Sequence, residues 1–263
     1  MANQEDVSSC LLISIEAFNR DGLFDTYRDY LVFMSLVRDG VRNCQFKIFG
    51  FCWIKKQCFL LIQPENKHIG GFILKLLKRY HFWLLQRGPS TTEFKLRILE
   101  LADSSWTLDC LRFLHQKAVN ENVVDDAMDY HWHSHHVYND FWSINWLDTT
   151  YILALFAGNR LVATNRFRQY MLHGHKLDFD RMLDSDDVSK NYIRQDEDSG
   201  WAIAREITSP QNTAVAEVNS QYHQSLLERT HISLNSQQSC LLIKIKVLKS
   251  ITTVNNHQIF SAS

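Results

Sequence analysis

A stretch of apolar and aromatic residues at positions 45–64 constrains the fold of this chain more than any other feature. Two runs rich in β-branched, aromatic and aliphatic side chains, residues 46–54 and 58–62, flank the polar break Lys55-Lys56-Gln57. The pattern predicts a β-hairpin, because such residues suit a half-buried pleated surface and the break suits a turn. Gly50, inside the first run, predicts either a β-bulge or a close approach of another segment to the backbone.

The segments around the hairpin predict further strands and helices. Strands are expected at residues 10–17, 45–54, 58–63 and 92–101, and helices with apolar residues at three- and four-residue spacing are expected at residues 25–41, 69–86 and 105–120. Asp25 is expected to cap the first helix, and Ser104 or Ser105 the third. Tyr80 belongs to the apolar stripe of the second helix and is therefore expected in the core.

These elements predict an α+β fold, with an antiparallel sheet covered by helices and followed by a mostly helical extension. The 263 residues allow one large domain or two small ones. We expect a first domain at residues 1–125, a helical extension at 126–182 and a C-terminal region at 183–263. The acidic segment 184–198 is the expected linker, and residues 240–248 alternate partly as a strand does.

Composition favours a cytoplasmic protein. The first nine residues are polar and do not resemble a secretory signal, and no apolar run approaches membrane-spanning length. None of the six cysteines forms a C-x-x-C pair, so buried free thiols in a reducing compartment are expected at Cys10, Cys44, Cys52, Cys58, Cys110 and Cys240.

Charge is distributed unevenly along the chain. Residues 42–97 contain eleven Lys and Arg against two Glu, a local net charge of +9, so the rest of the chain carries −10 of the total of −1. A basic segment with interleaved aromatics is typical of a nucleic-acid surface, although a functionally silent charged face remains an alternative. The candidate phosphate contacts are Lys55, Lys56, Lys75, Lys78, Arg79, Arg87, Lys95 and Arg97. Phe49, Phe51, Phe82 and Trp132 are candidate stacking faces for bases, with a core role favoured.

Residues 51–64, Phe-Cys-Trp-Ile-Lys-Lys-Gln-Cys-Phe-Leu-Leu-Ile-Gln-Pro, resemble the hairpin of the REP-associated tyrosine transposases, a group of single-tyrosine HUH transposases. The family pattern there is A-Y-C-L-M-P-N-H-V-H-L-L-V-x-P. Its two histidines hold a divalent cation that polarises the scissile phosphate. This chain has Gln57 and Phe59 in their places. One glutamine oxygen does not replace two imidazoles, so no metal and no cofactor are expected.

The resemblance extends over about residues 8–172. Residues 111–124 fall on the family run L-R-Y-I-H-L-N-P-V-R-A-G-L-V, whose tyrosine is the nucleophile. That position is Phe113, which has no hydroxyl to attack phosphorus. Residues 129–138 match D-Y-P-W-S-S-Y-x-x-Y through Tyr130, Trp132, Ser134 and Tyr138, and residues 146–156 match W-L-D-T-D-x-x-L-x-x-F.

The resemblance implies a ferredoxin-like topology and a catalytically inactive, domesticated relative of these transposases. Such a protein is expected to bind structured or single-stranded DNA or RNA as a regulatory or recruiting module, since phosphate contacts need cationic side chains and no metal. The alternative is a protein-interaction scaffold that docks a larger defence or transposition complex through its acidic C-terminal region.

The sequence also offers two candidate active sites that are unrelated to the transposase resemblance. His131, His133, His135 and His136 could hold a metal in a nuclease with a relocated site, but the aromatic residues among them favour a packed loop. Cys58 could form a nucleophilic pair with His115, although a cysteine on a strand is more often a small core residue.

Overall fold

The computed structural model describes residues 10–18, 21–42, 46–64, 69–87, 93–174, 176–193, 230–234 and 241–247, the last two ranges for the backbone alone. The first elements are β1 (Leu11–Ala17), α1 (Tyr27–Arg42), β2 (Phe46–Ile54), β3 (Gln57–Pro64), α2 (Ile69–Leu85), β4 (Glu93–Glu100) and α3 (Ser104–Asn120). They are followed by the 3-10 turn η1 (Ala127–Asp129), α4 (His135–Tyr138), α5 (Thr150–Ala154), α6 (Arg160–Met171), α7 (Phe179–Ser185), β5 (Thr230–Leu234) and β6 (Leu241–Val247).

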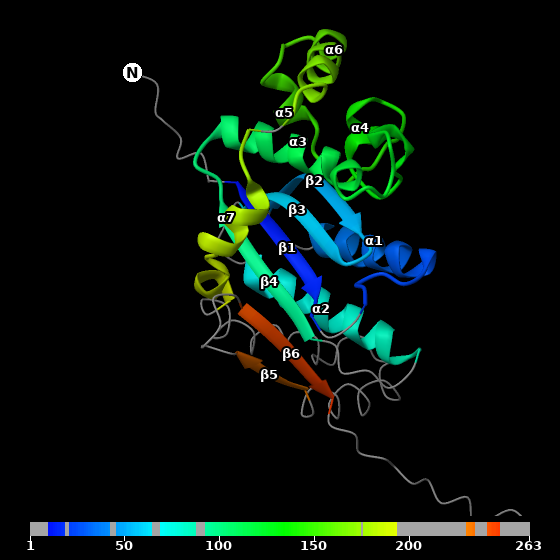
Figure 1. Ribbon diagram of the computed structural model, residues 1–263, viewed down its shortest axis with the longest axis vertical. Coiled ribbons are helices and arrows are strands. Elements are labelled where there is room, and N and C mark those ends of the chain that lie inside the picture. Colours follow the sequence, from blue (N-terminus) through cyan, green and yellow to red (C-terminus); the bar gives the residue numbers. More distant parts are fainter. Residues whose placement is uncertain are drawn as a thin grey trace, which may run out of the picture.

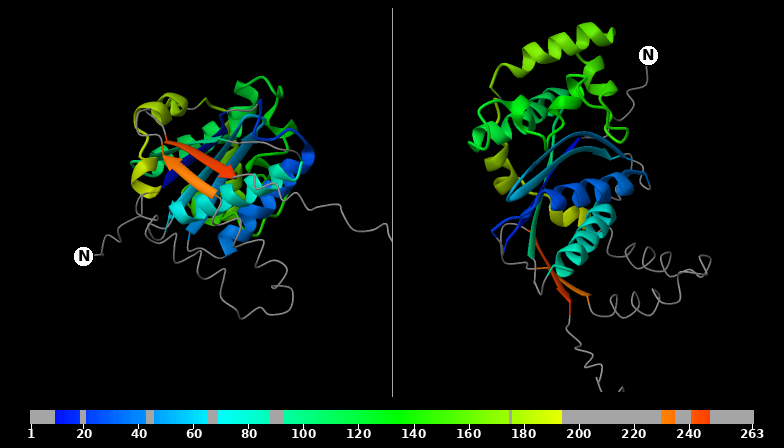
Figure 2. Two further views of the ribbon diagram at one scale, coloured as in Figure 1. Left: turned by 90° about the horizontal axis from the view of Figure 1, so that it is seen from below. Right: turned by 90° about the vertical axis from the view of Figure 1, so that its right-hand side faces the viewer.

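The strands form one antiparallel sheet in the order β2-β3-β1-β4-β6-β5. Its first four strands, with α1 between β1 and β2 and α2 between β3 and β4, have the ferredoxin-like topology, so the α+β prediction is confirmed. Helices α1 and α2 cover one face of the sheet, and α3 and α7 cover the other (Figures 1 and 2). The alternation at 240–248 corresponds to β6.

The β2–β3 hairpin is present where the sequence predicts it. The register between the strands shifts between Ile48 and Gly50, which confirms the β-bulge. A Cβ atom on Gly50 would lie 2.5 Å from Cδ1 of Leu111, so α3 crosses the backbone there at close range. Both features predicted from Gly50 are therefore present, and the glycine allows α3 to pack against β2.

The cap of α3 differs from the predicted one, and α1 begins two residues after Asp25. Helix α1 begins at Tyr27, and the buried Asp29 carboxylate in its first turn accepts hydrogen bonds from the backbone N–H groups of Asp25 and Thr26. Helix α3 is capped by Asp103, whose side chain accepts the N–H groups of Ser105 and the following residue. A carboxylate capped α3 where a serine was expected, because both residue types accept hydrogen bonds at this position.

The free edge of β2 is covered by residues 130–148. Three backbone bonds join the two segments: Trp53 N–H to Trp132 O (2.8 Å), Ser134 N–H to Phe51 O (3.0 Å) and Asp148 N–H to Ile48 O (2.8 Å). The hydroxyls of Tyr130 and Tyr138 donate to carbonyls of the same strand. These contacts satisfy groups that an exposed edge strand would offer to other chains.

The core contains the residues that periodicity assigned to it. Tyr80 is buried, and its hydroxyl donates to the carbonyl of Leu23 at 2.7 Å. Cys10, Cys52, Cys58 and Cys110 are free and buried as expected, while Cys44 and Cys240 lie outside the described residues.

The C-terminal region is described only in part. Residues 194–229, 235–240 and 248–263, most of the region assigned to 183–263, lie outside the described residues. Of the segment expected to be a linker, Asp187 and Val188 bond to the backbone of Ile98 in β4. Within the ranges given above, no helix has the length and apolar character needed to cross a membrane.

Candidate nucleic-acid interface

The positions where the resemblance implies a lost active site lie on the face of the sheet covered by α3 and α7. Phe59 of β3 and Phe113 of α3 are buried and meet edge to face, with ring centroids 5.5 Å apart at 89°. Gln57 lies two residues before Phe59 in β3, and its Nε2 donates to Oγ of Ser14 at 2.7 Å. The fold thus brings Phe59 and Phe113 together, and it fills the space between β3 and α3 with hydrocarbon.

A buried ammonium group lies beside the two rings. Nζ of Lys117 is 5.4 Å from the ring centroid of Phe59 and 5.2 Å from that of Phe113. It forms ion pairs with Asp180 of α7 at 2.7 Å and with Glu121 at 3.0 Å. A buried charge is tolerated only when it is paired. The carboxylate of Asp180 in α7 is therefore one of the two groups that stabilise the buried ammonium of Lys117.

The thiols of Cys52 in β2 and Cys58 in β3 are protonated at neutral pH. Burial raises the pKa of Cys52 to about 12, although the nearby Lys117 acts in the opposite direction. Burial also raises the pKa of Cys58 well above its usual value. His115 bonds to Ser134 and His135, so the imidazole proposed as a partner for Cys58 is engaged elsewhere. A nucleophilic Cys58 finds no support in this geometry.

Two of the expected phosphate contacts are enclosed on the same face. Arg97 is 8% exposed and pairs with Glu16 and Asp184, each at 3.2 Å. Lys95 lies 3.9 Å from Asp184. Both cations thus have carboxylate neighbours and Arg97 is buried, while their contact with nucleic acid stays a prediction. Alternate residues of β4 face inward, and Lys95 lies opposite Glu16 in the antiparallel pairing with β1, so their charges are met by nearby carboxylates.

Two further candidate phosphate contacts, on the face covered by α1 and α2, also form ion pairs with carboxylates. Arg87 forms an ion pair with the buried Asp29. Burial raises the pKa of Asp29, but hydrogen bonds from Arg87, Trp83 and Thr26 outweigh it and hold that pKa below its usual value. Arg79 lies 3.4 Å from Asp39, with both side chains exposed. Arg87 therefore helps to hold α2 against α1, whereas the Arg79 pair is of the exposed kind that contributes little.

Four candidates remain open to solvent. Lys55 and Lys56 are exposed in the β2–β3 turn, Lys75 is exposed on α2, and Lys78 is half-buried beside it, where desolvation lowers its pKa. Within the described part of the chain, none of these four side chains forms an ion pair with a carboxylate. They are the residues best placed to meet a phosphate backbone.

The four aromatic candidates for base stacking also divide into buried and exposed side chains. Phe49 and Phe51 are fully buried and are excluded as stacking faces, whereas Phe82 is 44% exposed and Trp132 is partly exposed. Sequence reasoning missed Tyr27, which is 68% exposed in the first turn of α1 and contacts Trp132 with ring centroids 5.0 Å apart. Tyr27 precedes the apolar stripe of α1 in the sequence, and this position could have indicated that its ring is exposed.

The histidine tract forms a packed loop rather than a ligand set. His133 is buried with Nε2 2.8 Å from the carbonyl of Ala127, and His136 places Nε2 3.0 Å from the carbonyl of Tyr130. Because a carbonyl only accepts, each of these Nε2 atoms carries the proton, and in the neutral ring the lone pair lies on Nδ1. In the part of the chain that the structure covers, no group of three or more His, Cys, Asp or Glu is arranged to hold a metal.

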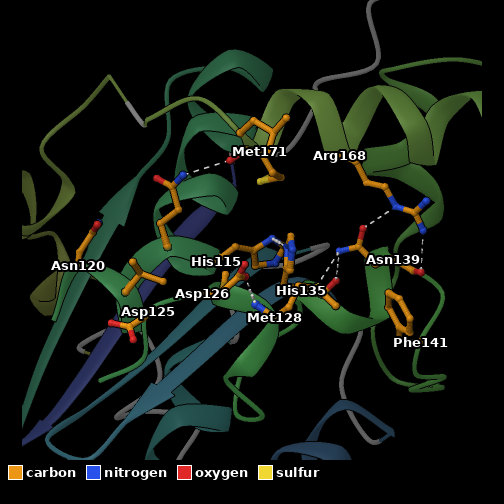
Figure 3. A pocket seen from close by; sticks show the side chains of 14 residues that line it. His115, Asn120, Asp125, Asp126, Met128, His135, Asn139, Phe141, Arg168 and Met171 are labelled. Atoms are coloured by element: carbon orange, nitrogen blue, oxygen red, sulfur yellow. Dashed lines mark hydrogen bonds between the residues drawn. The ribbon is translucent and has the colours of Figure 1, made fainter. Parts of the chain in front are cut away.

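A cleft of about 690 Å³ opens beside this loop, between α3, η1, α4 and α6 (Figure 3). His115 and His135 lie at its centre with their Nδ1 atoms 3.1 Å apart, so one of the two nitrogens carries the shared proton. Desolvation lowers the pKa of His115 well below its usual value and that of His135 to about 4. Both rings are therefore neutral at physiological pH. On the rim, Arg168 bonds to the side chain and carbonyl of Asn139.

Comparison of the chain with known proteins shows a distant structural likeness and no sequence match. No family model matches the chain, and no curated protein matches it. A solved structure described as the REP-associated tyrosine transposase bound to a REP hairpin aligns with 54% of this chain and 88% of that chain, at 12% identity and a TM-score of 0.43. A likeness of this degree assigns the chain to no family.

Proposed function

We propose that this protein binds single-stranded or hairpin nucleic acid without cleaving it, and acts as a regulatory or recruiting module. The observation that carries the proposal is the pair Lys55–Lys56, two exposed lysines in the turn of a rigid hairpin with no carboxylate partner among the described residues. Unpaired, exposed ammonium groups neutralise phosphates at little cost, because no existing ion pair has to be broken first.

The absence of cleavage is proposed from the chemistry of three positions. Phosphodiester transfer needs a nucleophile and a group that stabilises charge on the phosphate. Phe113 offers no nucleophile, Phe59 offers no lone pair, and both are packed into the core. The amide of Gln57 is engaged with Ser14. Restoring activity would require at least two simultaneous changes in a filled space.

Binding is tested by fluorescence anisotropy with a labelled DNA hairpin carrying a single-stranded tail, and with its RNA counterpart, over a salt series. The double variant Lys55→Glu/Lys56→Glu is expected to weaken binding of both and to reduce the salt slope by about 1 for each lost phosphate contact. The matched control is Lys176→Glu/Arg181→Glu, which makes the same charge change on exposed residues elsewhere. No binding at low salt, or an equal loss in the control, would contradict the proposal.

Cleavage is tested separately by incubating the same substrates with Mg²⁺ or Mn²⁺. We expect the substrate to stay intact. Metal-dependent nicking that disappears in His135→Ala, with an unchanged circular dichroism spectrum, would show that the histidine cleft is an active site instead.

A protein-interaction scaffold is the second candidate. The observation that favours it is a set of exposed apolar side chains in the region of α5 and α6: Leu155, Leu161, Val162 and Leu172, of which Leu161 is 72% and Leu172 78% exposed. Exposed apolar groups of this kind occur at protein interfaces. The scaffold function predicts no affinity for any nucleic acid at low salt. It also predicts that sedimentation velocity detects a protein complex, and that the variant Leu161→Lys/Leu172→Lys disrupts this complex.

A further inference from the structure

We propose that Tyr27 and Trp132 form a stacking platform for unpaired bases, linked through Tyr30 and Phe24 to the hairpin turn that carries Lys55 and Lys56. The inference rests on the proposed function and specifies it, because it names the part of the nucleic acid that is recognised. A ligand that uses this platform must present at least one base outside a duplex, since a paired and stacked base has no free face to offer.

A continuous series of ring contacts connects the hairpin turn to the exposed tyrosine. The carbonyl of Lys55 accepts the backbone N–H of Phe24 at 3.0 Å. Phe24 stacks on Tyr30 with ring centroids 4.4 Å apart, and Tyr30 stacks on Trp132 at 4.6 Å. Tyr27 then meets Trp132 at 61°, with ring centroids 5.0 Å apart. The series runs from buried Phe24, through partly exposed Tyr30 and Trp132, to Tyr27 at the surface.

The platform is held by backbone hydrogen bonds at its two residues or their neighbours. The carbonyl of Trp132 accepts the N–H of Trp53 at 2.8 Å, which fixes the tryptophan against the edge of β2. Tyr27 belongs to the first turn of α1, where the buried carboxylate of Asp29 holds the backbone of Thr26 at 2.8 Å. Rings placed in advance lose little freedom when a base stacks on them, so the contact contributes fully to binding.

Exposed cations lie in the turn where this series of rings begins, and a further one follows Tyr27 in the sequence. Lys55 and Lys56 are exposed in the turn whose backbone is bonded to Phe24. Arg28 follows Tyr27 in the sequence, and its guanidinium carbon lies 4.9 Å from the centre of the Trp83 ring. Aromatic faces beside cations bind single strands with little sequence preference, because every base has a π-face and every nucleotide a phosphate.

The test compares two strands of equal charge: an oligothymidylate, and a sugar–phosphate strand of the same length without bases. Phosphate contacts are the same for both strands, so a difference in affinity reports stacking. Wild-type protein is expected to bind the base-bearing strand at least fivefold more tightly, the lower end of what one stacked base contributes. Tyr27→Ala is expected to remove most of this preference, whereas Tyr27→Phe retains the ring and the preference.

Two control variants separate the platform from the cations. Phe18→Ala removes another exposed aromatic side chain, just after β1, and is expected to leave the preference intact. Lys55→Glu/Lys56→Glu is expected to weaken both strands by the same factor. Equal affinity of wild-type protein for the two strands, or an unchanged preference in Tyr27→Ala, would overturn the platform alone. Failure of wild-type protein to bind either strand would overturn the proposed function as well.

Discussion

The turn of the β2–β3 hairpin and the strand that follows it differ sharply in how far their side chains are exposed to solvent. Lys55 and Lys56, in the turn, are exposed and unpaired among the described residues, while Phe59, three residues further along, is sealed against Phe113 under α3. The charges on the sealed side, Lys117 and Arg97, are each met by carboxylates. Charges in the sealed region thus serve the fold, whereas those in the open region are available to a ligand.

The difference follows from what burial demands. A charge taken out of water must be paired, and an apolar ring gains stability by being packed. On the sheet face under α3, Phe59 and Phe113 place apolar rings against each other, and this packing closes that face. Phosphate binding needs only exposed cations, and the turn keeps them. The comparison predicts that the sealed region controls stability and the open region controls binding.

The largest expected effect is on the sealed side. Phe113→Ala should lower the free energy of unfolding by about 3–5 kcal/mol, because it leaves a cavity between Phe59 and Phe179. Urea denaturation measures this. The control Phe82→Ala, at an exposed ring, should change it by about 0.5 kcal/mol or less. Similar values for the two variants would remove the contrast between the regions.

Acidification should also destabilise the packed side of the molecule. Burial lowers the pKa of His133 to about 3 and that of His135 to about 4, below the usual value of 6.5. The unfolded chain therefore binds protons first, and stability is lost as the pH falls from 6.5 toward these values. Between pH 7 and pH 5 each histidine should cost about 1–2 kcal/mol.

Urea midpoints at the two pH values measure this loss. His133→Gln should make stability less dependent on pH, while Phe82→Ala, which removes no titratable group, should leave the dependence as in the wild type. An equal pH dependence in all three proteins would contradict the assignment of neutral buried imidazoles.

A smaller effect is expected from the carboxylate that α7 contributes. Asp180→Ala removes the shortest ion pair of the buried Lys117 and leaves it with Glu121 alone. We expect a loss of about 1–2 kcal/mol, since Asp180 is itself half exposed and its pairing is screened. Asp39→Ala, which removes the exposed partner of Arg79, should cost less than about 1 kcal/mol in the same denaturation experiment.

The smallest stability change is expected in the turn. Lys55→Ala/Lys56→Ala should leave the free energy of unfolding within about 0.5 kcal/mol of the wild type, because no described contact of either side chain supports the fold. The same variant should weaken nucleic-acid binding in the anisotropy experiment. A destabilised turn variant, or one with unaltered affinity, would break the division between the two regions.

The local elements could be predicted because their signals are local. The hairpin, the bulge at Gly50 and the buried stripe of α2 follow from side-chain period and from the special geometry of glycine. The cap of α3 was missed because Asp103, Ser104 and Ser105 are all good capping residues. Its side chain proved to be the acceptor only in the folded chain.

The candidate site was predicted less completely, because exposure depends on residues far apart in the sequence. The sequence shows eight cations of equal rank, but Glu16 and Asp184 enclose Arg97, and Asp29 holds Arg87. Phe49 and Trp132 were equal candidates for stacking, and only the packing of β2 buries the first.

The sequence by itself determined the α+β order of elements and which functional groups stand at positions 57, 59 and 113, because side-chain period and functional groups are properties of the residues themselves. The tertiary structure alone decided which cations stay in water and that Tyr27 meets Trp132. Burial and charge pairing depend on partners from distant segments, and no local pattern specifies those partners.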